Sequence, residues 1–230
     1  MGFFSIHKPA EDALLKFLEA IPSRFRYYEI NLNTFNKLTS AEYSAKSNIT
    51  CELDLADSYE KIYGGYSENT QRNIKRAHNN HLTITKDVTI SDLIELFRQY
   101  RGKTIKNLKT RNYKTLTGIV QSAIHKKKAQ IIGVKTKENN TCAGAVFLAD
   151  KRKFIFLFSA ASNEAKSNGA MSFLIDHFIR ENAQQNLILD FEGSNNPDLA
   201  RFYKSFGSKE CVYLQVKKNQ LPWYVKWLKN

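Results

Sequence analysis

The sequence predicts an α/β protein of the α+β kind, with a mixed, mostly antiparallel twisted sheet flanked by helices. Two observations carry this prediction. Apolar, strand-like segments at 129–137, 141–150 and 153–162 are separated only by short turns, which is typical of an antiparallel meander. An amphipathic helix at 169–184 and a second apolar strand at 186–194 then follow, so helix and strand alternate towards the end of the chain.

The composition indicates a soluble globular chain. It has 230 residues, of which 42% are hydrophobic and 25% charged. No apolar run approaches the roughly 20 residues that a membrane-spanning helix needs. The first residues lack the features of a signal peptide, and Ile6 departs from the myristoylation pattern. The three cysteines (Cys51, Cys142, Cys211) are far apart and have no metal-ligand spacing, which favours a reducing compartment. We therefore expect a cytoplasmic protein without a metal site.

The chain is strongly basic, with a formal net charge of +13 and a pI near 9.6. This charge favours an anionic partner: a phosphate-rich cofactor, a nucleic acid or an anionic membrane surface. A solvated basic surface explains the same charge equally well. The cations cluster at 71–78, 101–114 and 125–128, without zinc-finger spacing or an RNA-recognition consensus.

Before residue 80 we expect, in order, a helix at 10–20, strands at 25–33 and 47–55, a short helix at 58–65 and a basic helix at 68–79. The first helix has Leu14, Leu15 and Leu18 on one face. Ser67 stands at the N-cap position of the basic helix, whose apolar positions are few. Most of that helix should therefore face water.

Between residues 81 and 128 we expect a strand followed by two helices. The strand is 81–87, the first helix is capped by Ser91, and the second covers 113–128 with Ile119 and Val120 on its inner side. After a short helix at 197–205, a last strand covers 208–218. The tail 220–230 is aromatic, and two interpretations compete for it: docking on the core, which is favoured, and membrane contact.

From about Gln71 the predicted order is β-α-α-β-β-β-α-β-α-β, which resembles the GNAT acetyltransferase fold. In that family the fourth strand leads to a Q/R-x-x-G-x-G/A loop at a helix start, where backbone N–H groups hold the pyrophosphate of coenzyme A. The matching residues here are 165–170, with Gly169 and Ala170 at the helix opening; the first glycine and the initial Arg or Gln are missing. Orphan N–H groups and the helix dipole favour a phosphate at such a place. A glycine there can also serve structure alone. The resemblance implies that acetyl-coenzyme A is bound by Ser159, Ala160, Ala161, Lys166, Ser167, Asn168, Gly169, Ala170, Asn196 and Tyr203.

A second match to the family is the spacing Asn-x6-Tyr-x3-Gly, reproduced by Asn196, Tyr203 and Gly207. The resemblance implies that Tyr203 protonates the departing thiolate, and that substrate binds where the fourth and fifth strands splay apart. Glu192, directly after the fifth strand, is the best placed base for the amine proton, with Asp190 as its competitor. The alternatives are a tyrosine packed in the core and carboxylates that cap or solvate the surface.

A narrower resemblance covers the whole chain. Residues 66–84 are similar to the S-x-x-x-R-R-N-I-R-K-A segment that introduces the catalytic half of Fem-type peptidyl transferases and the BioF2-like acetyltransferase group. Residues 190–208 resemble their closing DF-x-G-S … FY-x-x-FG. Those proteins have two GNAT-like halves. We therefore expect an abbreviated N-terminal subdomain packed on the core (1–66), a GNAT-like acyltransferase domain (67–219) and a C-terminal tail (220–230).

The resemblance implies an N-acetyltransferase, which moves an acyl group from acyl-coenzyme A to an amine of a small molecule or peptide by direct attack. One alternative is the Fem-type reaction, in which an aminoacyl group passes from tRNA to a peptidoglycan precursor. In that case the cations of 71–78 and 101–114 would contact the RNA backbone. A second alternative is a non-catalytic GNAT-like binding module.

Overall fold

Strand β5 (Thr141–Asp150) is apolar at successive positions because helices cover both faces of the sheet there. Ala143, Ala145 and Phe147 belong to one core cluster, and Val146 to another on the opposite face. Gly144 shares the face of Val146, and a Cβ on it would come within 2.3 Å of the Leu93 side chain. This two-sided burial explains why the segment reads as a continuous apolar run and not as an alternating one.

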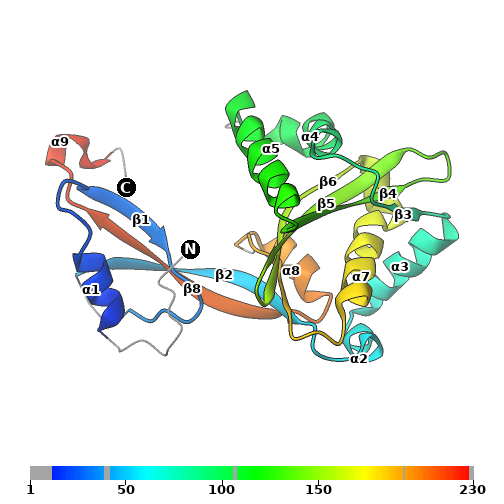
Figure 1. Ribbon diagram of the computed structural model, residues 1–230, viewed down its shortest axis with the longest axis horizontal. Coiled ribbons are helices and arrows are strands. Elements are labelled where there is room, and N and C mark those ends of the chain that lie inside the picture. Colours follow the sequence, from blue (N-terminus) through cyan, green and yellow to red (C-terminus); the bar gives the residue numbers. More distant parts are fainter. Residues whose placement is uncertain (1–11, 39–41, 106–107, 194, 228–230) are drawn as a thin grey trace. The chain divides into compact units, whose positions relative to one another are not determined.

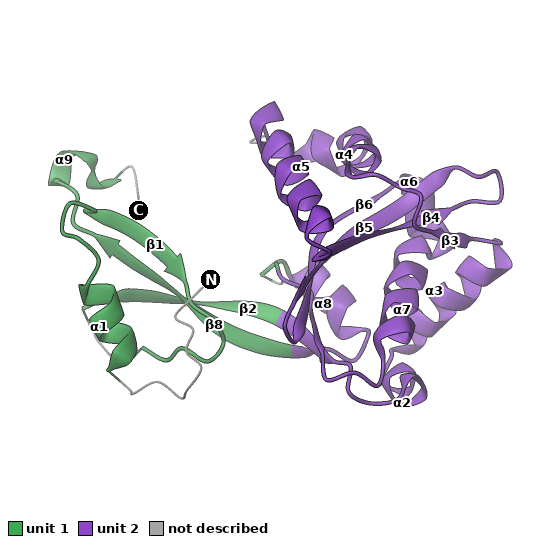
Figure 2. Cartoon of the chain, viewed as in Figure 1, with its two compact units in different colours: residues 1–50, 193–196, 210–230 green, residues 51–192, 197–209 purple. Residues whose placement is uncertain are grey.

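The computed structural model describes residues 12–38, 42–105, 108–193 and 195–227 (Figure 1). The chain divides into two compact units (Figure 2). Unit 1 comprises residues 1–50, 193–196 and 210–230, and unit 2 comprises residues 51–192 and 197–209. Strand β2 (Ser44–Asp54) runs from the first unit into the second. The domain limits expected from the sequence stay a prediction.

Unit 1 contains helix α1 (Ala13–Glu19), strand β1 (Tyr27–Asn31), most of β2, strand β8 (Lys209–Asn219) and the short helix α9 (Trp223–Lys226). Strands β1 and β8 pair antiparallel, from Tyr27 opposite Asn219 to Asn31 opposite Gln215. The small core of the unit is formed by Leu14, Leu18, Leu32, Tyr43 and Val216. The predicted helix face with Leu14 and Leu18 inward is confirmed, while residues 10 and 11 lie outside the described residues.

The aromatic tail does not dock on the core as the sequence suggested. Trp223, Tyr224 and Trp227 are 86%, 60% and 67% exposed. Helix α9 is a single turn, so its side chains have no room to share one buried face. Leu228, the last apolar residue of the predicted helix, lies outside the described residues.

Unit 2 holds the remaining elements. In chain order they are α2 (Tyr59–Gly64), α3 (Glu68–Asn79), β3 (Thr83–Thr85), α4 (Ile90–Gln99), the 3-10 turn η1 (Arg101–Thr104), α5 (Thr110–His125), β4 (Ala129–Lys135), β5, β6 (Lys153–Ala161), α6 (Asn163–Asn168), α7 (Ala170–Asn182), β7 (Ile188–Asp190) and α8 (Pro197–Lys204). The strand order within this unit is β2-β7-β6-β5-β4-β3. Every pairing along it is antiparallel except that of β6 with β7. The predicted mixed, mostly antiparallel sheet is confirmed.

Helices α4 and α5 cover one face of this sheet, and α7 with α3 covers the other (Figure 1). On the α4 side, Phe97 packs against Phe158 of β6 with ring centroids 5.0 Å apart. On the α7 side, Phe147 and Phe178 stack with centroids 3.8 Å apart. Aromatic contacts such as these add to the stabilisation that burial alone provides.

Three local predictions for unit 2 need correction. Helix α4 is capped by Thr89, whose side chain forms a capping box with Asp92, and not by Ser91. Ile119 of α5 is 51% exposed, and Val120 alone of the two faces inward. The loop expected before α7 contains a helix of its own, α6, because the Ser162 side chain accepts a hydrogen bond from the Ala165 N–H and caps it.

Candidate functional site

Strands β6 and β7 separate after only three paired positions. Lys153, Phe154 and Ile155 pair in parallel with Ile188, Leu189 and Asp190. Strand β6 then continues to Ala161 alongside β5, whereas β7 ends at Asp190. The sheet therefore opens between these two strands, at the place where the sequence predicted substrate to bind.

The paired end of the opening is held by an ion-pair cluster that the sequence reasoning missed. Lys153 Nζ lies 2.6 Å from Glu52 Oε1 and 2.9 Å from Asp190 Oδ2. The carboxylates are mostly buried, with 15% and 8% of their side-chain surface exposed. Burial opposes the charge of Lys153, but its hydrogen bonds to the two carboxylates raise its pKa above the ordinary value. Glu52 and Asp190 lie opposite each other on β2 and β7, so Lys153 ties three neighbouring strands together.

Asp190, the second candidate for a catalytic base, is bound on both sides by groups of the protein. Besides Lys153, its carboxylate accepts a hydrogen bond from the backbone N–H of Glu192 at 2.9 Å. This hydrogen bond between residues 190 and 192 stabilises a turn in which Glu192 has a left-handed backbone, with φ of 50°. The Asp190 carboxylate therefore holds the turn that carries Glu192, and the choice of base between the two stays a prediction.

Glu192 follows the buried Phe191 and is exposed, but it lies beyond the end of β7 in a left-handed backbone, so strand alternation does not set the direction of its side chain. Partial loss of hydration and the nearby Asp190 carboxylate raise the pKa of Glu192 above the ordinary value. A carboxylate with a raised pKa is a stronger base than an ordinary one. Its role in proton transfer stays a prediction.

Tyr203 lies on α8 and is buried, with 7% of the residue exposed. The ring stacks on Phe191 with centroids 4.7 Å apart and meets the edge of Phe156 at 6.1 Å. No hydrogen bond joins its hydroxyl to another described side chain or backbone group. The fully buried tyrosine hydroxyls without a partner are, among the described residues, those of Tyr28, Tyr43 and Tyr66. Packing against Phe191 and Phe156 therefore fixes the Tyr203 ring, while its hydroxyl makes no hydrogen bond to the described residues.

Burial raises the pKa of Tyr203 to about 12. The phenol is thus fully protonated at neutral pH. Phe156 lies on β6, and Phe191 directly follows β7. These are the two strands that separate, so Tyr203 packs where the sheet opens.

The other two residues of the Asn-x6-Tyr-x3-Gly match have different surroundings. Gly207 has a φ of 80°, and a Cβ on it would come within 3.2 Å of the Gly65 carbonyl oxygen. This glycine ends α8 where the chain passes close to the end of α2, which is a structural role. Asn196 belongs to unit 1, so its predicted part in donor binding stays a prediction.

The start of α7, predicted to hold a pyrophosphate, is packed against helix α3. Gly169 has a φ of 81°, and a Cβ on it would come within 2.2 Å of the Asn73 carbonyl oxygen. Arg76 Nη1 donates to the Ser167 carbonyl oxygen at 3.2 Å. The N–H of Ala170 donates to the side-chain oxygen of Asn168 at 3.1 Å. The backbone of α3 therefore occupies the space that a side chain at position 169 would need.

The remaining residues predicted to contact coenzyme A lie around this joint. Asn168, Gly169 and Ala170 are buried, whereas Lys166 and Ser167 are exposed on α6. Ser159, Ala160 and Ala161 end β6 and pair with Ala145, Gly144 and Ala143 of β5. Their contacts with a cofactor stay a prediction. Among the described residues, no group of three or more His, Cys, Asp or Glu side chains is arranged to hold a metal ion.

Helix α3 has a narrow packing face beside its wet one. Thr70, Ile74 and Ala77 are buried at spacings of four and three residues, one above the other on the helix. Ile74 and Ala77 are the few apolar positions that the sequence shows in this helix. The wet face expected for this helix exists, but the opposite face packs on α6 and α7.

A second buried polar cluster lies between α2 and α7. The carboxylate of Asp176 is 2% exposed and accepts a hydrogen bond from the Tyr59 hydroxyl at 2.8 Å. Burial raises the pKa of Asp176, although Tyr59 and Arg180 oppose the shift. Arg180 also donates to the Tyr59 hydroxyl at 2.8 Å and lies over its ring. No sequence motif indicated this network.

The strand order and the opening between β6 and β7 define a GNAT-like fold. No family model and no curated protein matches the chain. Solved structures do. FemX aligns with 92% of this chain and 78% of its own, at 13% identity and a TM-score of 0.63. The C-terminal domain of a putative lysylphosphatidylglycerol synthetase from Agrobacterium fabrum aligns over 94% of this chain and 75% of its own, at 15% identity and a TM-score of 0.57.

L-PGS from Bacillus licheniformis is similar over 95% of this chain and 68% of its own, at 12% identity and a TM-score of 0.52. At such identities the likeness shows the fold alone. The predicted GNAT-like fold of the Fem type is thereby confirmed. Within the described part of the chain, no helix has both the length and the apolar character required to cross a membrane.

Proposed function

We propose that this protein is an acyltransferase that joins an acyl group to an amine where β6 and β7 separate. The observation that carries the proposal is the state of Tyr203. Packing against Phe191 and Phe156 fixes its ring, and its hydroxyl has no hydrogen-bond partner among the described residues. A pKa of about 12 keeps the phenol protonated at neutral pH. These are the properties of a general acid that waits for its substrate.

In the proposed reaction the amine nitrogen attacks the acyl carbonyl carbon directly. A C–N bond forms, and the bond between the carbonyl carbon and the leaving oxygen or sulfur breaks. Tyr203 donates its proton to that leaving atom, and the surplus proton on the amine passes to Glu192 directly or through a water molecule. The raised pKa of Glu192 suits it to accept this proton. Most of the acceleration comes from holding amine and carbonyl together.

The donor that fits the site best is an aminoacyl ester on tRNA, the alternative raised by the Fem-type resemblance. Helix α3 packs on Gly169, and this packing disfavours a pyrophosphate at the start of α7. A sugar alkoxide is also a more basic leaving group than a thiolate, so it depends more on a general acid such as Tyr203. The net charge of +13 supports a polyanionic donor.

Acetyl-coenzyme A is the second candidate donor. The observation in its favour is that α7 begins at Ala170, directly after Gly169 and downstream of the small residues that end β6, as the sequence predicted. A helix start of this kind binds phosphate when its N–H groups are accessible.

Transfer assays with both donors test the proposal. Radiolabelled aminoacyl-tRNA and radiolabelled acetyl-coenzyme A are each incubated with the protein and a panel of lysine peptides and small amines. We expect amide product from aminoacyl-tRNA, and a roughly 100-fold or larger loss of single-turnover rate in Tyr203→Phe with donor affinity nearly unchanged. An equal fall in donor affinity and rate would remove the general-acid role. Product from acetyl-coenzyme A alone would establish the second donor, and no product from either would reject the acyltransferase.

A further inference from the structure

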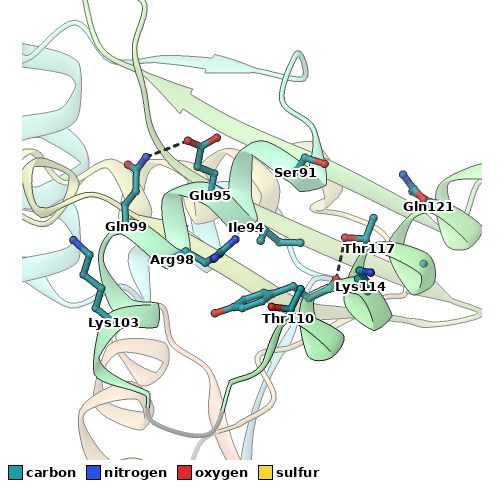
Figure 3. Close-up of a pocket in the computed structure, with 12 residues that line it drawn as sticks. Ser91, Ile94, Glu95, Arg98, Gln99, Lys103, Thr110, Lys114, Thr117 and Gln121 are labelled. Atoms are coloured by element: carbon teal, nitrogen blue, oxygen red, sulfur yellow. Dashed lines mark hydrogen bonds between the residues drawn. The ribbon is translucent and has the colours of Figure 1, made fainter.

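A groove with a volume of about 740 Å³ lies between helices α4 and α5, on the face of the sheet opposite α7 (Figure 3). Its walls come from α4, η1 and α5. Its lining includes Arg98, Gln99, Lys103, Thr110, Tyr113 and Lys114. None of them belongs to the acyl-transfer site described above.

The groove carries an excess of positive charge that the protein itself does not neutralise. Arg98, Lys103 and Lys114 line it, and none of the three has an ion pair with a described acidic residue. The lining includes one carboxylate, Glu95, which accepts a hydrogen bond from Gln99 at 3.3 Å. Three unpaired cations around one hollow repel one another, so an anion bound between them relieves that repulsion.

One of these cations is held in place. The guanidinium of Arg98 lies 5.6 Å from the centre of the Tyr113 ring, a cation–π arrangement. Tyr113 in turn contacts the Phe97 ring edge to face, with centroids 6.5 Å apart. A Cβ on Gly102 would lie 3.2 Å from the Tyr113 hydroxyl oxygen. The glycine at position 102 therefore lets Tyr113 pack closely against η1. Packing thus positions Arg98 before any ligand arrives, which lowers the entropy cost of binding.

The positive field continues beyond the groove. Thr110, the first residue of the 16-residue helix α5, lines it, so the positive end of that helix dipole lies at the groove. Exposed cations adjoin it: Arg101 on η1, Lys109 at the N-cap of α5 and Arg111 on α5. The sequence 101–114 contains no acidic residue.

The dimensions favour an extended polyanion over a single phosphate. The lining residues of α5 run from Thr110 to Gln121, which is about 16 Å of helix at 1.5 Å per residue. The cations come from both walls and continue along one rim, whereas a site for one phosphate concentrates its donors on one point. We propose that this groove binds the phosphate backbone of a single-stranded RNA segment. The proposal deepens the proposed function, on which it rests, by naming the surface that holds the RNA part of the donor.

The test uses the full-length protein and a fluorescein-labelled 12-nucleotide single-stranded RNA of mixed sequence, with fluorescence anisotropy read between 50 and 200 mM salt. Three phosphate contacts predict a slope of log K against log salt near −2, which is a roughly 20-fold loss of affinity over that range. The triple variant Arg98→Gln, Lys103→Gln, Lys114→Gln should lose most of this slope. The charge-preserving variant Arg98→Lys, Lys103→Arg, Lys114→Arg should retain it.

A matched control removes three exposed cations elsewhere in unit 2: Lys86→Gln, Lys137→Gln, Lys151→Gln. If this control weakens binding as much as the groove variant does, RNA binding reflects net charge and the groove assignment is overturned. Unchanged binding in the groove variant overturns it equally. Competition by polyglutamate of matched charge as strong as that by unlabelled RNA would show a general polyanion groove and reject RNA as its ligand. Competition by inorganic pyrophosphate as strong as that by unlabelled RNA would indicate a small-anion site and would also reject RNA as the ligand.

Transfer assays separate this proposal from the proposed function. With aminoacyl-tRNA as donor, the groove variant should raise the KM for the donor and leave the single-turnover rate at saturation unchanged. If the groove variant transferred with an unaltered KM for the donor, the groove assignment would be overturned while the proposed function would stand. Groove-dependent RNA binding without transfer in the wild-type protein would overturn the proposed function and leave the groove in place.

Discussion

Replacing Gly169 by alanine tests whether helix α3 closes the start of α7. The added Cβ would lie 2.2 Å from the Asn73 carbonyl oxygen and 2.9 Å from its carbonyl carbon. An ordinary contact needs at least 3.4 Å, so α3 or α7 would have to shift by more than 1 Å, since 3.4 − 2.2 = 1.2 Å. Both atoms are backbone, so no side-chain rotation relieves the overlap.

The cost has two parts. A non-glycine residue in the left-handed region costs about 1–2 kcal/mol, and overpacking of this kind costs about 1–3 kcal/mol. Their sum, about 2–5 kcal/mol, is a large share of the stability of a typical domain. For a chain of this length it corresponds to a fall of roughly 4–20 °C in Tm.

The assay is urea and thermal unfolding followed by circular dichroism. Gly118→Ala is the matched control, because Gly118 lies inside α5 and a Cβ on it has nothing within 4 Å. That change should be neutral or stabilising by up to about 1 kcal/mol, since alanine favours a helix. If Gly169→Ala melted like the wild-type protein, α3 would not rest on Gly169. The backbone of α3 would then not keep a pyrophosphate from the start of α7.

Three further predictions concern unit 2. Lys153→Met should lower the free energy of unfolding by about 1–3 kcal/mol, because two mostly buried carboxylates lose their cation; an unchanged urea midpoint would contradict this. Tyr59→Phe should cost about 1–3 kcal/mol through the lost hydrogen bond to buried Asp176, and Tyr63→Phe, in the same helix, should cost less. The pKa of Glu192 is raised, so kcat/KM should fall on acidification at a pH above that of an ordinary carboxylate. Glu192→Gln should remove that acidic limb, and a limb that persists would reject the base.

The fold could be predicted from sequence because its signals are local. Turns of a few residues join the three strands of the meander. The N-cap residues Ser58 and Ser67 directly mark the starts of their helices. The candidate site was harder, because its decisive contacts join distant segments. Asn73 meets Gly169 and Glu52 meets Lys153 across about a hundred residues, and neither pair shows in any local pattern. A glycine required by a crossing helix looks the same in sequence as a glycine required by a phosphate.

The ambiguity of that glycine can be resolved at the neighbouring residues. Lys166 and Ser167 are exposed on α6, and the Ser167 hydroxyl donates to the Glu164 carbonyl of its own helix. If the joint serves structure, Lys166→Ala with Ser167→Ala should leave the affinity for aminoacyl-tRNA within about twofold, because one surface cation contributes little at physiological salt.

If instead the joint holds the pyrophosphate of coenzyme A, the same double variant should weaken acetyl-coenzyme A binding at least tenfold, since it removes a charge-assisted hydrogen bond. Isothermal titration with both donors separates the outcomes. Gly169 takes no part in this comparison, because its substitution disturbs α3 under either interpretation. A selective loss of acetyl-coenzyme A binding would show that the helix start is open in solution, and would reverse the order in which the two donors are proposed.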